Sequence, residues 1–144
     1  MIQIKGGGPL DKQVTYDTEA DMGYIYLAEP FKYKISNTEE LPQNNDIMLD
    51  FCNHVPIIGI ELAGDTAIKI SHLVDTVHIF KKVTTADNEI IYSFRLNDKS
   101  VKQSVTHSYA AKIVFLFSDA DCLDFIGIDI YDTESYDESF LIGG

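Results

Sequence analysis

Apolar and polar residues alternate with a period of two along most of this chain, a pattern typical of β-strands that have one buried face and one exposed face. The alternating segments are short and rich in Ile, Val, Tyr and Phe, and turn-forming sequences such as LPQNND, TADNE and SDAD separate them. An all-β or mostly β domain follows. The pattern predicts strands at residues 14–16, 23–27, 46–51, 57–62, 67–70, 76–80, 90–96, 110–117 and 125–131.

Residues 68–82 admit a second interpretation. If Ile68, Leu73, Val77 and Phe80 lay on one side, the segment would form an amphipathic helix. Its high content of β-branched residues favours strands, and strands are the interpretation that we adopt.

Two stretches of the chain repeat one pattern. Residues 46–62 (DIMLDFCNHVPIIGIEL) and residues 112–130 (KIVFLFSDADCLDFIGIDI) each contain an apolar strand, a polar turn and an Ile-Gly-Ile-acid sequence. Aligning Gly59 with Gly127 requires a turn two residues longer in the second copy. An insertion of two residues keeps the inside-outside alternation, whereas an insertion of one would reverse it.

The repeat extends upstream, where Tyr24 would match Tyr92 and Tyr26 would match Phe94. We therefore predict two similar antiparallel β-meander halves, packed as one sandwich or half-barrel domain and followed by an acidic segment. Chance similarity between β-hairpins is the competing explanation. The halves would span residues 14–72 and 88–131, and the acidic segment residues 132–144.

Three blocks of the first half, YDTEAD, LDF and GIE, form a further pattern. They resemble a small bacterial domain family of unknown function, whose hallmark is Tyr-Asp-x-Glu-Ala-Asp before a Tyr-Ile strand, followed by a Leu-Asp-aromatic strand and a Gly-Ile-Glu-Ile strand. The second half keeps only IGIDI, and the turn NHVP departs from the acidic, glycine-containing turn usual in that family. The resemblance implies a small β-meander module without a known activity, and we expect the tyrosines of this region to help build and cover the core. The residues that fit are Tyr16, Asp17, Glu19, Ala20, Asp21, Tyr24, Ile25, Leu49, Asp50, Phe51, Gly59, Ile60 and Glu61.

The length of 144 residues suits one compact domain, and a hydrophobic content of 45% is enough for a sizeable core. The longest apolar runs are far shorter than a membrane span, and the polar start of the chain has no signal-peptide core, so we expect a protein that stays in the cytoplasm. Cys52 and Cys122 form no CxxC motif, and we interpret them as two free thiols.

The chain is strongly acidic, with 23 Asp and Glu residues against 11 Lys and Arg residues and a net charge of -12. Such a field repels nucleic acids and anionic membranes, and it favours a basic partner. Solubility alone is the competing explanation of the acidity.

The spaced acids Asp17, Glu19 and Asp21 resemble the start of a calcium loop. Met22 and Ala28 stand where an EF-hand requires Gly and Glu, so the metal pattern fails. We expect instead that Asp17 and Asp21 organise a turn between two strands by accepting hydrogen bonds from nearby backbone N–H groups.

Other candidate sites are incomplete. Asp119, Asp121 and Asp124 form an acidic turn without the glycine of a calcium loop, and Cys52 with His54 supplies only half of a metal site or catalytic dyad. The sequence GGGP lacks the Lys-Ser/Thr of a phosphate loop, and the chain has no Gly-x-Ser-x-Gly or Ser-x-x-Lys sequence. We therefore predict no enzyme activity, no metal site and no cofactor.

The C-terminal third is the candidate binding surface. Residues 113–144 contain eight acids and no Lys or Arg, whereas residues 68–112 hold seven of the 11 basic residues. Carboxylates make charge-assisted bonds with Lys and Arg, and aromatic residues are common interface anchors. A solvated acidic tail is the alternative. The predicted partner-binding residues are Asp129, Tyr131, Asp132, Glu134, Tyr136, Asp137 and Glu138, together with Glu39 and Glu40 of an acidic loop.

Size, charge and the lack of an active-site motif indicate an inhibitor. In this general character the chain resembles immunity proteins of bacterial contact-dependent growth inhibition systems. The resemblance implies a monomer that occludes the cationic cleft of a basic toxin, an RNase or DNase domain, in the cell that makes it. The alternatives are a small-ligand or metal-binding β module and an unrecognised hydrolase with carboxylate or Cys-His chemistry.

Overall fold

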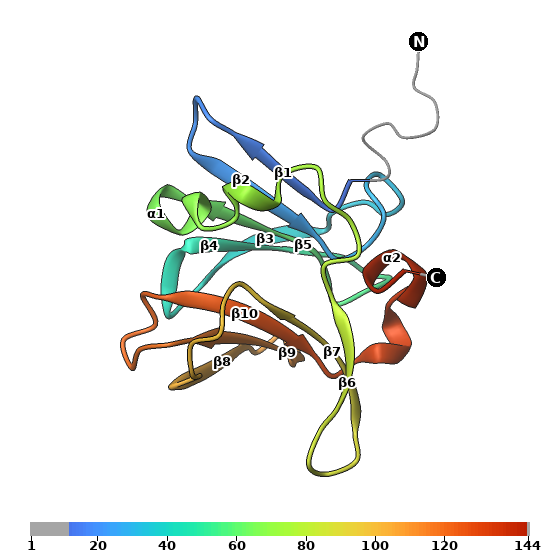
Figure 1. Cartoon of the computed structure of the whole chain (residues 1–144). Coiled ribbons are helices and arrows are strands. Elements are labelled where there is room, and N and C mark those ends of the chain that lie inside the picture. The colour runs from blue at the N-terminus through green and yellow to red at the C-terminus, as the bar shows by residue number, and fades with distance from the viewer. Residues whose placement is uncertain (1–11, 144) are drawn as a thin grey trace.

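A computed structural model describes residues 12–143, which form two five-stranded antiparallel sheets. The two sheets lie face to face, one above the other (Figure 1). Sheet A contains β1 (Val14–Asp17), β2 (Met22–Tyr26), β3 (Asn37–Leu41), β4 (Asn44–Phe51) and β5 (Ile57–Ala63). Sheet B contains β6 (Lys81–Thr84), β7 (Ile90–Arg95), β8 (Gln103–His107), β9 (Ala110–Phe117) and β10 (Phe125–Ile130). The helical elements are α1 (Gly64–Ile68), η2 (Ser71–Leu73), η3 (Thr133–Ser135) and α2 (Glu138–Leu141).

Both sheets have the same topology. The strand order is β1-β2-β5-β4-β3 in sheet A and β6-β7-β10-β9-β8 in sheet B. Each half starts with a hairpin, crosses to the far edge of its sheet and returns through two more hairpins, so that its last strand lies beside its second. The predicted fold class, a mostly β domain with two similar antiparallel halves, is confirmed.

The hairpins that were aligned by their glycines are equivalent in register. Gly59 pairs with Asp50 and Gly127 pairs with Leu116, and in both hairpins the register shifts at the next pair. The turn between the strands is two residues longer in the second hairpin, as the sequence predicted. The second half also begins earlier than residue 88, because β6 is its first strand.

The upstream alignment is wrong by one residue. Tyr26 pairs with Gly59, and Arg95 pairs with Gly127, so Tyr26 corresponds to Arg95 and not to Phe94. A shift of one residue moves a side chain to the other face of a sheet.

The same shift shows that Tyr24 and Tyr92 are not equivalent. Tyr24 corresponds to Ser93, and both point outward, whereas Tyr92 and Phe94 face the interior and are almost fully buried. The tyrosines of β2 therefore cover the outside of sheet A, and Ile25 fills the core position that Phe94 fills in sheet B.

The strands predicted at residues 67–70 and 76–80 are wrong. Gly64, with φ +57, turns the chain off β5 into α1, and the side chain of Ile70 packs into the space above Gly23. Residues 76–80 form an extended link whose hydrogen bonds go to Gln13 and to the C-terminal helix rather than to a neighbouring strand. Of the β-branched residues in this region, Ile70 and Ile79 pack against the core, whereas Ile68, Val74 and Val77 are exposed, so their presence does not indicate a sheet.

Three strands, β3, β6 and β8, were not predicted from the sequence. Each is the edge strand of its sheet, and each is mostly exposed. Exposed edge strands carry polar side chains on both faces, so they lack the alternation from which a strand is predicted.

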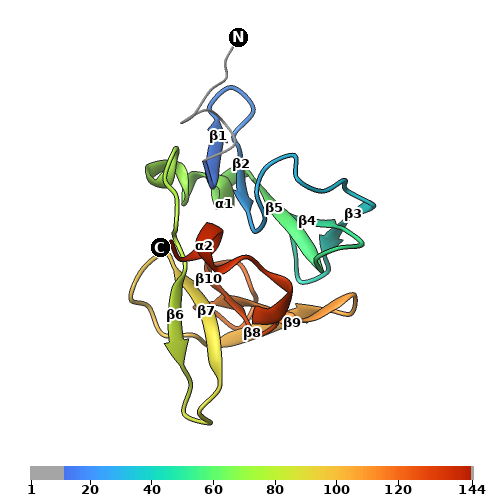
Figure 2. The ribbon, with the colours of Figure 1, turned by 90° about the vertical axis from the view of Figure 1, so that its right-hand side faces the viewer.

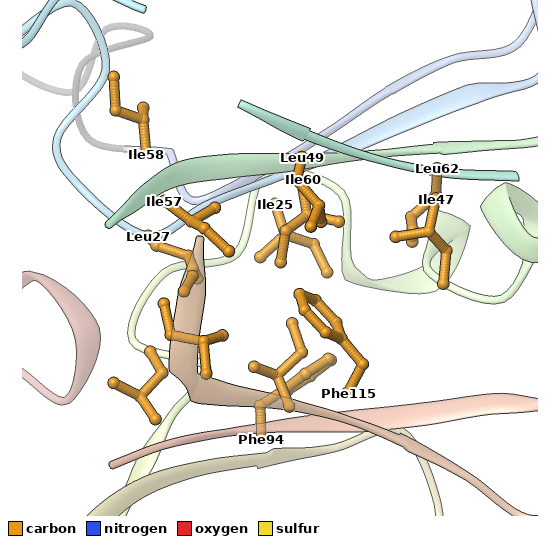
Figure 3. Packing of buried hydrophobic residues seen from close by; sticks show 14 of the residues in the cluster. Ile25, Leu27, Ile47, Leu49, Ile57, Ile58, Ile60, Leu62, Phe94 and Phe115 are labelled. Atoms are coloured by element: carbon orange, nitrogen blue, oxygen red, sulfur yellow. The ribbon is translucent and has the colours of Figure 1, made fainter. Parts of the chain in front are cut away.

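The core lies between the two sheets and belongs to both. Ile25, Leu49 and Ile60 of sheet A point toward Phe94 and Phe115 of sheet B (Figure 3), and all five are 3% exposed or less. The apolar face of either sheet alone would be exposed to water. The two halves therefore fold as one unit.

The C-terminal segment closes one side of this core (Figure 2). The hydroxyl of Tyr136 donates to the carbonyl of Ile57 at 2.8 Å and accepts its N–H at 2.9 Å, and Leu141 is fully buried. Within residues 12–143, no helix is long and apolar enough to cross a membrane. Cys52 and Cys122 are both free thiols, as predicted.

Gly127 is required by the close approach of β10 to β7. A Cβ atom at this position would lie 2.2 Å from the backbone oxygen of Phe94, whereas the atoms nearest to a Cβ at Gly59 belong to the ring of Tyr24. We expect Gly127→Ala to lower the free energy of unfolding by about 1–3 kcal/mol, and Gly59→Ala, made in a Tyr24→Ala background and compared with that parent, to lower it less, because no ring is then left to displace. Urea unfolding followed by circular dichroism measures both, and equal losses would contradict this account.

Candidate functional site

The acids of the β1–β2 turn serve the turn itself. Asp17 Oδ1 accepts the N–H groups of Glu19 at 3.0 Å and Ala20 at 3.4 Å, which confirms its predicted role. Asp21 acts differently, because it has a left-handed backbone with φ +50 and accepts the Tyr16 hydroxyl at 3.4 Å. Among the described residues, no three His, Cys, Asp or Glu side chains are grouped so that they could hold a metal ion.

The outer face of sheet A gathers carboxylates around two tyrosines. Strand alternation directs these side chains away from the core, and acids stand on four of the five strands while β2 supplies the tyrosines. We call this surface the acidic face. Its residues are Asp17, Tyr24, Tyr26, Glu40, Asp50 and Glu61.

A hydrogen-bond network holds the centre of the acidic face. The Tyr24 hydroxyl donates to Asp50 Oδ2 at 2.6 Å, and the Thr38 hydroxyl donates to Asp50 Oδ1 at 2.5 Å. The Tyr24 ring lies over Gly59, where any larger residue would displace it. Three strands, β2, β4 and β3, are therefore tied together on the outside by one buried carboxylate.

The protonation of Tyr24 suits this network. Burial raises the pKa of Tyr24 far above its ordinary value, and the hydrogen bond to Asp50 raises it further. Burial, aided by the charge of Asp50, also raises the pKa of Tyr26, whose ring centroid lies 4.6 Å from that of Tyr24. Both tyrosines therefore stay protonated at neutral pH, and Tyr24 remains a donor.

The corresponding face of sheet B holds a carboxylate in another way. Arg95 lies over Gly127, and its guanidinium donates to both oxygens of Asp129 at 2.7 and 3.2 Å. Leu116 stands where sheet A has Asp50, because both residues pair with the equivalent glycine. One framework thus carries an acid held by hydroxyl groups in sheet A and an ion pair in sheet B.

The strands of the two sheets differ sharply in charge. Those of sheet A contain six acids and no Lys or Arg. Those of sheet B contain four Lys or Arg residues and a single acid, Asp129. The strands of sheet A therefore carry a net charge of -6, and those of sheet B a net charge of +3.

Three of the eight acids of the C-terminal third form ion pairs with Lys or Arg. Asp124 accepts from both Lys69 and Lys99, the latter at 3.0 Å, and Glu138 pairs with Lys82 at 3.0 Å. The arginine of β7 holds the acid of β10, as described above. The basic residues at 68–112 thus neutralise part of the acidic segment that follows them, which the linear sequence does not reveal.

Two of the predicted partner-binding residues are buried. Tyr136 is 7% exposed, and its hydroxyl is hydrogen-bonded to the backbone of Ile57. Asp129 is 8% exposed, and its carboxylate is paired with the guanidinium of Arg95. Neither side chain is free to anchor a partner, so the prediction is wrong for these two residues. A tyrosine between acids looks the same in sequence whether its ring lies in the core or in solvent.

Four other predicted residues make bonds inside the protein but remain at the surface. Asp137 caps α2 by accepting the Ser139 N–H at 3.0 Å, and the capping bonds lower its pKa. Asp132 accepts the Ser135 hydroxyl, and Glu39 lies 3.2 Å from His107 of sheet B. Glu138 is the ion-pair partner described above.

The remaining predicted residues are Tyr131, Glu134 and Glu40. Tyr131 is half-buried at the end of β10, and Glu134 and Glu40 are exposed. Glu40 belongs to the acidic face, whereas Glu134 lies on η3. The structure therefore does not bring the two predicted groups, the C-terminal segment and the acidic loop, into one surface.

Sequence reasoning missed the acidic face because it assigned Tyr24, Asp50 and Glu61 only to the fold. The alternation within each strand contained the signal, since each of the three lies directly between two buried neighbours and therefore points to the opposite face. Residues of the family pattern that point away from the core can form a surface site instead of stabilising the core.

The family model described as Protein of unknown function (DUF2283) matches residues 13–64, which include all of sheet A. Over 130 residues the chain is 32% identical to the "Uncharacterized protein YuzE" of Bacillus subtilis (strain 168). That alignment covers 90% of the chain and 95% of YuzE, and so extends through both sheets. No solved structure gives a significant match.

Removing the Tyr24 hydroxyl should weaken the fold. Tyr24→Phe leaves the buried Asp50 carboxylate with one hydroxyl donor fewer, so we expect the free energy of unfolding to fall by about 1–3 kcal/mol. Tyr26→Phe is the matched control, because the same atom is removed from a neighbouring ring that makes no such bond. Urea unfolding measures both variants, and equal losses would rule out a specific role for the Tyr24–Asp50 bond.

The paired carboxylates should make the fold sensitive to acid. The hydrogen bond from Lys69 lowers the pKa of Asp124 well below 3.8, and the bond from Lys82 lowers the pKa of Glu138 below 4.5. A depressed folded-state pKa stabilises the fold above the unfolded-state value, and this contribution is lost as the pH falls through the folded-state value.

We therefore expect wild-type stability to decline between about pH 6 and about pH 2, and Asp124→Asn to flatten part of that decline while lowering stability at neutral pH. Urea midpoints measured across this range provide the comparison. A variant whose decline parallels that of the wild type would show that Asp124 does not contribute.

Proposed function

The chain belongs to the family of YuzE, a family of small domains of unknown function, and we propose that it is an acidic binding protein of the immunity type. It would neutralise a basic bacterial toxin, a nuclease domain, by covering the toxin's cationic cleft in the cytoplasm. It would act as a monomer and without catalysis or a cofactor.

The charge difference between the two sheets is the observation that carries this proposal. Every charged side chain on the strands of sheet A is acidic, whereas the strands of sheet B carry four Lys or Arg residues and one acid, which is ion-paired. Nuclease clefts are cationic because they bind phosphate, so a surface with uncompensated carboxylates complements them and accelerates encounter.

The tyrosines of the acidic face add contact area to this charge. Tyr24 and Tyr26 are half-buried against each other and leave part of each ring at the surface. The Tyr24–Asp50–Thr38 network fixes this arrangement before binding, which reduces the entropy lost on association. Rigid aromatic anchors within a charged surround are typical of interface centres.

The C-terminal segment has a smaller part in this proposal than in the prediction from the sequence. Glu134 and Tyr131 remain available at the surface, together with Asp132, and would extend an interface if the partner reached around the molecule. Tyr136 and Asp129 are left out because they are buried.

Removal of charge from the acidic face tests the proposal. The triple variant Glu19→Gln, Glu40→Gln and Glu61→Gln removes two carboxylates of the acidic face and one of the adjoining β1–β2 turn. All three are exposed or half-exposed and make no ion pair among the described residues. The partner to be tested is the product of the neighbouring gene, which we expect to contain a basic toxin domain, and its association rate is measured by stopped flow. We expect a decrease of at least about tenfold at low salt that shrinks at high salt, because exposed charges are screened.

The matched control removes three acids from the other half, Asp87→Asn, Glu89→Gln and Asp98→Asn, which are exposed near β7. It makes the net charge of the protein less negative by the same amount as the first triple variant, but it should slow association with the partner much less. Equal effects of the two triple variants would show that only the overall charge matters. A neighbouring gene product that does not bind the wild-type protein would contradict the immunity role itself.

A further inference from the structure

Cys52 and His54 meet in the turn between β4 and β5. Cys52 Sγ lies 3.9 Å from His54 Nδ1, and the backbone N–H of His54 donates to the same sulfur at 3.3 Å. The ring of Tyr33 stacks on the imidazole, with centroids 4.8 Å apart and planes inclined by 10°. The thiol thus has a hydrogen-bond donor and a base beside it, and the base is held by an aromatic ring.

The turn itself does not require sulfur. In the second half, the equivalent turn starts with Ser118 and is held by oxygen atoms, since Asp119 accepts the N–H groups of Leu123 and Asp124. Oxygen accepts a backbone hydrogen bond better than a thiol does. A hydroxyl at position 52 would therefore satisfy the turn, and the thiol calls for another explanation.

The loop that carries Tyr33 also carries two positive charges. Lys32 and Lys34 are the only Lys or Arg residues between positions 13 and 68, and both lie on this loop. The Lys32 ammonium is 5.5 Å from the centroid of the Tyr33 ring, which stacks on His54. Partly exposed cysteines beside a base are the ones that react, because the thiolate is the nucleophile.

Cys122 provides the contrast within the same chain. Its side chain is 3% exposed, and burial together with the charges of Asp119 and Asp121 raises its pKa. Cys52 is half-exposed and has a histidine beside it. The two thiols should therefore differ widely in reactivity.

We propose that Cys52 and His54 form a thiol–imidazole pair and that Cys52 is a site of reversible modification by small disulfides. The Cys52 proton passes to His54 Nδ1, and the thiolate attacks one sulfur of the disulfide. A new S–S bond forms to Cys52 while the original S–S bond breaks. The second half of the reagent leaves as a thiolate and takes the proton from His54, so charge and atoms balance.

The experiment uses the folded full-length protein and two probes, oxidised glutathione and an aromatic disulfide that releases a coloured thiolate. We expect one thiol per chain to react quickly and the second only after unfolding. Cys52→Ser should abolish the fast reaction, and Cys122→Ser should preserve it. Peptide mapping by mass spectrometry identifies the modified residue.

The role of His54 is tested by His54→Ala, with Asn53→Ala as the control in the same turn. We expect His54→Ala to slow the reaction at least about tenfold at neutral pH, because a thiol without a base is only a few per cent thiolate there, while unfolding midpoints stay close to wild type. Its rate should then rise with pH like that of an ordinary thiol, and Asn53→Ala should react as the wild type does. A Cys52 rate equal to that of a free peptide thiol, or a rate unaffected by His54→Ala, would overturn the proposal.

Discussion

The packing of two apolar sheet faces against each other is the interaction on which the rest of the structure depends. Ile25 and Ile60 of sheet A are buried by Phe94 and Phe115 of sheet B, and burying each such side chain stabilises the fold by about 1.5–3 kcal/mol. A single five-stranded meander would leave its inner face exposed to water. The second half is therefore a structural partner of the first, and the C-terminal segment covers the open side that their contact leaves.

This shared core leaves the two outer faces free to differ. The same glycine position is covered by Tyr24 in sheet A and by Arg95 in sheet B, and the neighbouring carboxylate is held by hydroxyl groups in one case and by a guanidinium in the other. One face consequently keeps its negative charge, whereas on the other the carboxylate of Asp129 is neutralised. Because the strands of sheet A contain no Lys or Arg, their carboxylates form a candidate surface for a basic partner.

The sequence pattern predicted the buried strands, but it did not predict the exposed edge strands or the contacts between surface side chains. Strands such as β4 and β9 were predicted because their buried residues alternate, and the two-residue insertion was detected for the same reason. Edge strands such as β3 have no such pattern. The one-residue error at Tyr24 arose because aromatic residues suit either face of a strand. The pairing of Lys69 with Asp124, 55 positions away in sequence, could not be predicted because it exists only after the sheets have packed.

The claim that sheet A carries the binding surface is tested most directly by nuclear magnetic resonance. Amide shifts of the isotope-labelled protein would be recorded while the basic toxin domain is added. The account predicts that the largest changes fall on β2, β3 and β5, around Tyr24, Glu40 and Glu61, and that they diminish at high salt. Changes confined to sheet B or to residues 132–143 would contradict it.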